Sequence, residues 1–216
     1  GGAGCHSLPL QEIYPTLPFV SNEVAGALIG HALWLGLPIR ELLKRAGPDA
    51  GPDMVLSGSV DGFTASSPIE ALTDGRNAIL AVAMNGQPLP AEHGFPVRMV
   101  VPGLYGYVSA TKWVVELEVT TFADRTAYWT DRGWSELGPI KLQSRIDVPR
   151  SGSVLAAGDT VLAGGAWQAH VGGEGVEVQV DGGDWERGTP SAPVPGAHRG
   201  EVTLLRGPDS WGDQRA

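Results

Sequence analysis

Three basic side chains stand apart in an acidic chain and could bind an anion. The 216 residues carry a formal net charge of -9, and within residues 47–113 the only Lys or Arg residues are Arg76, Arg98 and Lys112, with His93 as a further candidate. Glycine turns in this region let the backbone approach a ligand closely. Arg can hold a phosphate through its planar fork and Lys as a point charge. These residues predict an anion site, and β-turns with surface cations are the alternative.

Composition excludes several other classes of function. The negative charge disfavours nucleic acid as a partner, because its phosphates would be repelled. Cys5 is the single cysteine, so neither an internal disulfide nor a cysteine-based zinc site is expected. The sequence shows no Gly-x-Ser-x-Gly elbow, no P-loop and no Gly-x-Gly-x-x-Gly after a strand. No apolar run reaches the roughly 18 residues of a membrane span, and no signal peptide is visible.

Short strands and few helices are expected to position the cations. The first 18 residues, rich in proline, predict a loop. Residues 38–46 predict the best helix, with an apolar face and Gly47 as its terminator, and residues 68–72 predict a helical turn. Asn85 and Gly86 form a turn signal. Apolar or alternating patterns predict four strands: Met54–Phe63, Ala78–Met84, Val97–Val101 and Trp113–Thr120.

The second half of the chain predicts a separate, smaller domain. Residues 122–138 are aromatic and charged without periodicity, as is typical of a connection between domains. From Ile146 onward, residues 154–155, 160–162 and 176–180 predict short strands, whose spacing favours a small β-sandwich. We therefore expect one domain over residues 1–138 and a second, partial domain over residues 139–216.

The segment from Asn85 to Trp113 carries four motifs in a fixed order: NG-x-PLP, HG-x-P-x-R, VPG and a closing KW. Together they resemble the sulfite oxidase family. The stretch SVDGFT at residues 59–64 and the residues PIK and QSRI within 139–146 agree with the resemblance, which spans residues 16–187. It implies an α+β fold, in which a mixed molybdopterin-binding domain precedes an immunoglobulin-like dimerisation domain that is truncated here.

The resemblance also implies a molybdenum cofactor with a pyranopterin and an anionic phosphate tail. Its implied activity is oxygen-atom or electron transfer on a small sulfur- or nitrogen-centred substrate. A separate redox partner (a cytochrome, haem or quinone-linked protein) and a homodimer are implied too. Relatives are commonly periplasmic, extracytoplasmic or tethered to a membrane. Seven residues would bind the cofactor by this resemblance: His93, Arg98, Ser109, Thr111, Lys112, Ser21 and Asn22.

The sequence departs from the family where the family places its molybdenum-ligating cysteine. The frame TLPFVSN at residues 16–22 has Phe19 at that position, and phenylalanine has no donor atom. No catalytic residue and no protein ligand to the metal are therefore assigned. Two alternatives to the enzyme follow, a pterin-binding pseudoenzyme and a dimerisation module. Five further pocket positions also differ from relatives, namely His31, Leu33, Gly58, Val82 and Ser109.

Overall fold

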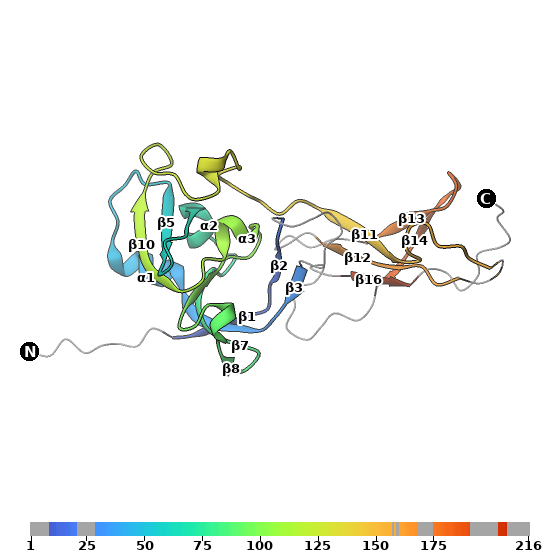
Figure 1. The fold of residues 1–216 in the computed structure, drawn as a ribbon, viewed down its shortest axis with the longest axis horizontal. Helices are drawn as coiled ribbons and strands as arrows, with labels where there is room; N and C mark the ends of the chain where they lie inside the picture. The colour runs from blue at the N-terminus through green and yellow to red at the C-terminus, as the bar shows by residue number, and fades with distance from the viewer. Residues whose placement is uncertain are drawn as a thin grey trace, which may run out of the picture. The chain divides into compact units, whose positions relative to one another are not determined.

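The computed structural model describes residues 9–20, 29–156, 158, 160–167, 175–190 and 203–206. The chain divides into two compact units, residues 1–140 and 141–216 (Figure 1). Within the described ranges, no helix combines the length and apolar character needed to cross a membrane.

A five-stranded antiparallel sheet of the first unit carries Arg98. Its order is β1 (Gln11–Ile13), β4 (Trp34–Pro38), β7 (Ile79–Met84) and β8 (Gln87–Pro88), with β9 (Arg98–Val100) also pairing with β7. The predicted turn between β7 and β8 is confirmed, since Asn85 and Gly86 both have positive φ angles, 52° and 75°. This sheet places Arg98 opposite Ala81 of β7.

A second, three-stranded sheet has the order β10 (Val114–Thr120), β5 (Met54–Ser59) and β6 (Thr64–Pro68), all antiparallel. The prediction of one strand over residues 54–63 is wrong for residues 60–63, which lie outside β5. The chain leaves the sheet after Ser59, because residues 60–63 turn so that β6 pairs back onto β5.

The prediction of a loop for the first 18 residues is wrong for its described part. β1 pairs with β4, and β2 (Thr16–Pro18) pairs with β3 (Ile29–His31). Proline favours extended backbone, which these short strands use, and their partners lie too far along the sequence to be visible in a local pattern. The short helix considered between Asn22 and Leu28 lies outside the described residues.

The predicted helix near residue 38 is confirmed as α1 (Ile39–Ala46). Ile39 and Leu43 are buried one turn apart, and the backbone N–H of Gly47 donates to the carbonyl of Leu43 in a left-handed cap. Such a cap favours glycine, because a Cβ is disfavoured at positive φ.

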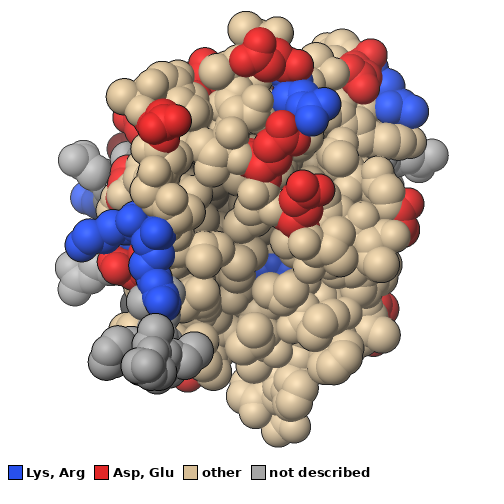
Figure 2. Space-filling view, turned by 90° about the vertical axis from the view of Figure 1, so that its left-hand side faces the viewer, with Lys and Arg blue, Asp and Glu red and all other residues tan. Residues whose placement is uncertain are grey.

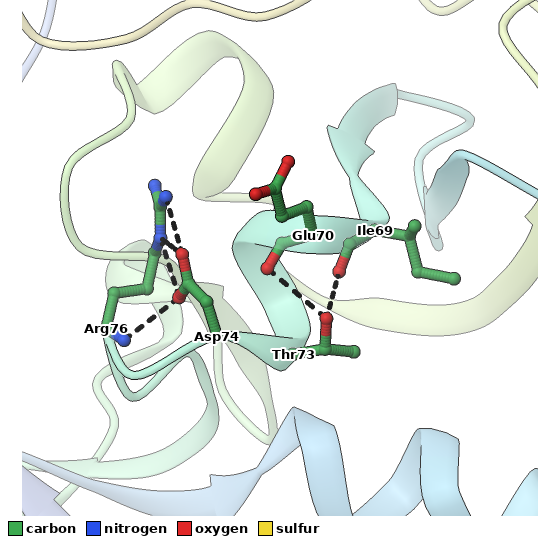
Figure 3. Close-up of polar contacts among 5 residues, drawn as sticks. All are labelled: Ile69, Glu70, Thr73, Asp74 and Arg76. Atoms are coloured by element: carbon green, nitrogen blue, oxygen red, sulfur yellow. Dashed lines mark hydrogen bonds and ion pairs between the residues drawn. The ribbon is translucent and has the colours of Figure 1, made fainter.

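The helical turn predicted at residues 68–72 is α2 (Ile69–Thr73), and Figure 3 shows how its end is fixed. The Thr73 hydroxyl donates to the carbonyls of Ile69 and Glu70, at 3.0 and 3.3 Å. Just beyond the helix, the guanidinium of Arg76 lies against the Asp74 carboxylate, with Nη2 and Oδ2 2.8 Å apart. One of the three isolated cations therefore has a carboxylate partner inside the protein.

Strand β9 runs between two clusters of buried apolar residues. Met99 packs in one cluster with α1, α2 and β5, whereas Val100 packs in the other with Trp34 and β7. Since side chains alternate along a strand, Arg98 shares the face of Val100 and Trp34. An arginine thus points into an otherwise apolar face.

The described strands of the second unit form a four-stranded and a two-stranded sheet, and the sandwich stays a prediction. The predicted strand at residues 154–155 is wrong, because these residues are exposed and outside any strand. The strand expected at 160–162 begins at Ala163 instead. The six strands are β11 (Gln143–Val148), β12 (Ala163–Trp167), β13 (Glu177–Gln179), β14 (Trp185–Arg187), β15 (Thr189–Pro190) and β16 (Thr203–Arg206).

Candidate functional site

Arg98 is buried, with 5% of its surface exposed, and its charge meets no carboxylate within 4.0 Å among the described residues. Its guanidinium lies 4.9 Å from the ring centroid of Trp34. Burial lowers the pKa of Arg98 to about 10, so the side chain stays charged at neutral pH. A buried cation is costly unless an anion or several acceptors surround it.

The hydrogen bonds of Arg98 leave some N–H donors of its guanidinium without a partner. Nη1 donates to the carbonyl of His93 at 3.1 Å, and Nη2 makes a long contact of 3.5 Å with the carbonyl of Ala110. Within the described chain, Arg98 Nε and the neighbouring Trp34 Nε1 are both buried donors that lack a partner. Because buried donors are normally satisfied, these two point to an acceptor from outside the chain.

One short 3-10 turn, η1 (Ala91–His93), anchors the basic residues. Its three successive carbonyls accept hydrogen bonds from Trp113 Nε1 at 2.8 Å, Lys112 Nζ at 3.1 Å and Arg98 Nη1 at 3.1 Å. The turn therefore brings Lys112 and Arg98, which are 14 positions apart, to the same loop. His93 itself is exposed and contributes its carbonyl.

Gly94 packs closely against the backbone ends of both Arg98 and Lys112. A Cβ at this position would lie 3.0 Å from the Cβ atoms of both Arg98 and Lys112. The φ angle of Gly94 is +107°, a conformation that residues with side chains rarely adopt. The HG-x-P-x-R motif thus needs its glycine for packing as well as for turning.

The predicted hydroxyl residues are buried and already hydrogen-bonded. Ser109, in α3 (Gly106–Ser109), donates to the carbonyls of Leu104 and Tyr105 at 3.1 and 2.9 Å. The Thr111 hydroxyl lies 2.7 Å from the Ser57 hydroxyl. Both side chains therefore stabilise the loop between β9 and β10. Their role toward a cofactor stays a prediction.

Phe19 borders a cavity of about 320 Å³, which we call the aromatic cavity. The ring packs directly on Gly106, where a Cβ would lie 2.2 Å from Phe19 Cε1. Five aromatic side chains, two charged side chains and three small or aliphatic residues line the cavity: Phe19, Phe63, Tyr107, Trp113, Trp129, Asp61, Lys112, Val20, Gly106 and Ala110.

The other positions that differ from relatives are scattered. Leu33 and Val82 border a second cavity of about 300 Å³ beside β7 and β8, and Gly58 lies in β5. His31 is half-buried, accepts or donates a 3.0 Å hydrogen bond with Thr16 and stacks on Tyr14; burial lowers its pKa. Ser21, Asn22 and Cys5 lie outside the described residues.

The face of the molecule in Figure 2 carries many acidic side chains and a separate group of basic ones. Figure 2 shows Asp and Glu side chains spread over the upper part of one face, with few Lys or Arg among them. Of the isolated cations, Arg76 is neutralised by Asp74, whereas Arg98 and Lys112 have no ion-pair partner among the described residues. An anion is therefore expected to bind at the latter two.

Comparisons with known proteins agree with this chemistry. The oxidoreductase molybdopterin binding domain family matches residues 5–129. Mitochondrial sulfite oxidase of Homo sapiens is 30% identical over 223 aligned residues, covering 82% of this chain and 40% of that protein. The inducible nitrate reductase (NADH) 2 of Glycine max is 34% identical over 149 aligned residues, covering 57% of this chain and 17% of that protein.

Among solved structures, the sulfane dehydrogenase SoxCD from Paracoccus pantotrophus has the same fold, with a TM-score of 0.70 at 23% identity. The match covers 92% of this chain and 57% of that one. The chain belongs to the molybdopterin-binding oxidoreductases of the sulfite oxidase family. It spans about two fifths of the length of the sulfite oxidases that it matches.

The residues present fit the organic part of the cofactor better than its metal. Unpaired Arg98 and Lys112, with the free donor of Trp34, suit an anionic group that carries several acceptors. Phe19 offers no donor atom, and the described residues contain no group of three or more His, Cys, Asp or Glu that could hold a metal ion.

Sequence reasoning did not find the carbonyls of η1, nor Trp34 and Trp113, as parts of the site. Main-chain carbonyls have no signature in a sequence. Trp34 is 64 positions from Arg98, so only the fold creates their pairing, whereas Trp113 follows Lys112 directly and is visible in the sequence as part of the KW motif.

Proposed function

We propose that this chain is the cofactor-binding part of a molybdenum-dependent oxidoreductase. It would transfer an oxygen atom or electrons on a small sulfur- or nitrogen-centred substrate. The observation that carries the proposal is the buried, unpaired guanidinium of Arg98 in an acidic chain. A phosphate or a polar pterin edge would supply the missing acceptor.

Within this proposal, the chain's own residues bind and orient the cofactor. Arg98 would hold an anionic group through the free part of its fork, and Lys112 would add a second charge from the same loop. Ser109 and Thr111 would keep that loop rigid. His93, Ser21 and Asn22 remain proposed contacts. When bound, the cofactor supplies the redox chemistry, and the protein supplies orientation, charge and exclusion of water.

We also propose that the second unit is an immunoglobulin-like dimerisation domain. We further propose that a separate redox partner, a cytochrome, haem or quinone-linked protein, exchanges electrons with the site. The strand-only character of the described part of residues 141–216 supports the first of these proposals. An active enzyme is favoured over a pseudoenzyme because relatives of the chain are named as oxidases and reductases.

A turnover assay tests the activity. The chain, expressed in a host that makes the cofactor, would be tested with sulfite, sulfoxides and nitrate, using a redox dye as electron acceptor or donor. We expect turnover in the wild type, more in Phe19→Cys, and none in Arg98→Met. Absence of turnover in both wild type and Phe19→Cys, each loaded with cofactor, would rule out the proposed activity.

A further inference from the structure

The aromatic cavity is held open by a connected set of rings. Phe63 contacts Tyr128, Tyr128 contacts Trp129, Trp129 contacts Trp134 and Trp134 contacts Tyr107, with ring centroids 5.5, 5.2, 4.7 and 4.9 Å apart. Three of these rings also line the cavity. Because each ring supports the next, the walls are formed before any ligand enters.

The polar atoms of two of these aromatic walls are already occupied. Trp113 Nε1 donates to the carbonyl of Ala91 at 2.8 Å, and the Tyr107 hydroxyl donates to the carbonyl of Ser135 at 2.8 Å. Burial raises the pKa of Tyr107, so its hydroxyl stays protonated and committed to that bond. Trp113 and Tyr107 therefore present only their ring surfaces to the cavity, because their polar hydrogens donate to backbone carbonyls.

The cavity is lined by two residues of opposite charge, Lys112 and Asp61. Lys112 donates to the carbonyl of Glu92, and its ammonium lies 4.4 Å from the ring centroid of Trp113. The Asp61 carboxylate accepts from the N–H of Phe63 at 3.0 Å. Asp61 adds a negative charge, and the single cation of the lining, Lys112, is the one that the proposed cofactor would use, so the cavity has no further positive charge to replace the hydration of a small anion.

We propose that the aromatic cavity binds an uncharged organic molecule with an aromatic ring, and that it discriminates against small oxyanions such as sulfite and nitrate. Ring faces favour apolar, planar ligands, whereas an oxyanion needs several convergent donors. As a statement about substrate, this rests on the proposed function. As a statement about binding, it concerns the lining residues, of which Lys112 is also a proposed cofactor contact.

Binding is measured on the full chain with methyl phenyl sulfide, an uncharged aromatic sulfur compound, and with sulfite, by ligand-observed NMR with matched titrations. We expect methyl phenyl sulfide to bind, and sulfite to bind about tenfold more weakly or not at all. Methyl phenyl sulfide failing to bind the folded chain, or sulfite binding equally well, would overturn the proposal.

Two substitutions locate the ligand. Val20 lines the cavity and is 41% exposed, so Val20→Arg adds a cation without disturbing the core. It should strengthen sulfite binding and weaken that of methyl phenyl sulfide. Val60→Arg, at a 71% exposed residue that does not line the cavity, is the matched control and should change neither.

Phe19→Ser removes one aromatic wall and should weaken binding of methyl phenyl sulfide about fivefold. Equal affinities in wild type, Val20→Arg and Phe19→Ser would place the ligand elsewhere and refute the assignment. Pterin content is measured on the same samples. If the chain retains pterin but does not bind methyl phenyl sulfide, only this inference is wrong. If it binds methyl phenyl sulfide but contains no pterin, only the proposed function is wrong.

Discussion

Arg76 and Arg98 lie in the same unit and have opposite electrostatic surroundings. Arg76 meets Asp74 two residues away, in a pair that remains partly exposed. Arg98 is almost fully buried, faces Trp34 and has no carboxylate partner among the described residues. A protein that leaves one buried arginine unpaired has a charge available for a ligand. The difference therefore separates a cation that stabilises the fold from one that serves binding.

The largest effect is expected from removing the unpaired charge. Arg98→Met should lower cofactor retention about tenfold or more, because hydrogen bonds between charged groups are the strong ones. The cofactor-free protein should unfold at the same or a higher temperature, since an uncompensated charge leaves the interior. Differential scanning calorimetry and pterin quantification check both results.

The lowered pKa of Arg98 determines how its destabilisation of the cofactor-free protein depends on pH. The folded-state pKa, about 10, lies below the ordinary value of an arginine, so the unfolded chain holds this proton more tightly. The destabilisation is constant at every pH below about 10 and is relieved as the pH rises through that value. A large loss of thermal stability in cofactor-free Arg98→Met at neutral pH would instead make Arg98 a structural residue.

Neutralising the second cation should have an intermediate effect. Lys112→Gln is expected to weaken cofactor retention about three- to tenfold, because a partly exposed ammonium is a weaker, solvent-screened point charge. Lys44→Gln, at an exposed residue of α1, is the control and should leave retention unchanged. Identical losses in the two variants would show a general charge effect in place of a site.

Removing Arg76, the paired cation, should lower the stability of the fold without changing cofactor binding. Arg76→Met removes the ion pair with Asp74 and is expected to lower the free energy of unfolding by about 1 kcal/mol or less, with cofactor content unchanged. Chemical denaturation measures the first quantity. If Arg76→Met loses cofactor as Arg98→Met does, the lack of a carboxylate partner does not distinguish a cofactor-binding arginine from a structural one.

The smallest effect concerns His31, whose pKa is lowered by burial. As the pH falls below about 6.5, the unfolded chain takes up a proton that folded His31 resists, so stability falls with it. In His31→Asn the decline of the melting temperature between pH 6.5 and 5 should be shallower. An unchanged slope would mean that other groups cause the acid-side decline.

The sequence predicted the elements with strong local signals and the identity of the cations. The helix ending at Gly47 and the Asn85–Gly86 turn carry their own signals, and both are confirmed. The strands before residue 19 were missed, because their stability comes from distant partners. The isolation of Arg98 is also invisible to a sequence pattern, because it depends on which distant segments of the chain pass beside the guanidinium.

We propose that the charge of Arg98 serves the cofactor. The most direct measurement is the pterin and molybdenum content of wild type, Arg76→Met and Arg98→Met, purified from one host that makes the cofactor. We predict close to one pterin per chain in wild type and Arg76→Met, and almost none in Arg98→Met. Equal pterin content in all three, or none in the wild type, would show that Arg98 does not serve cofactor binding.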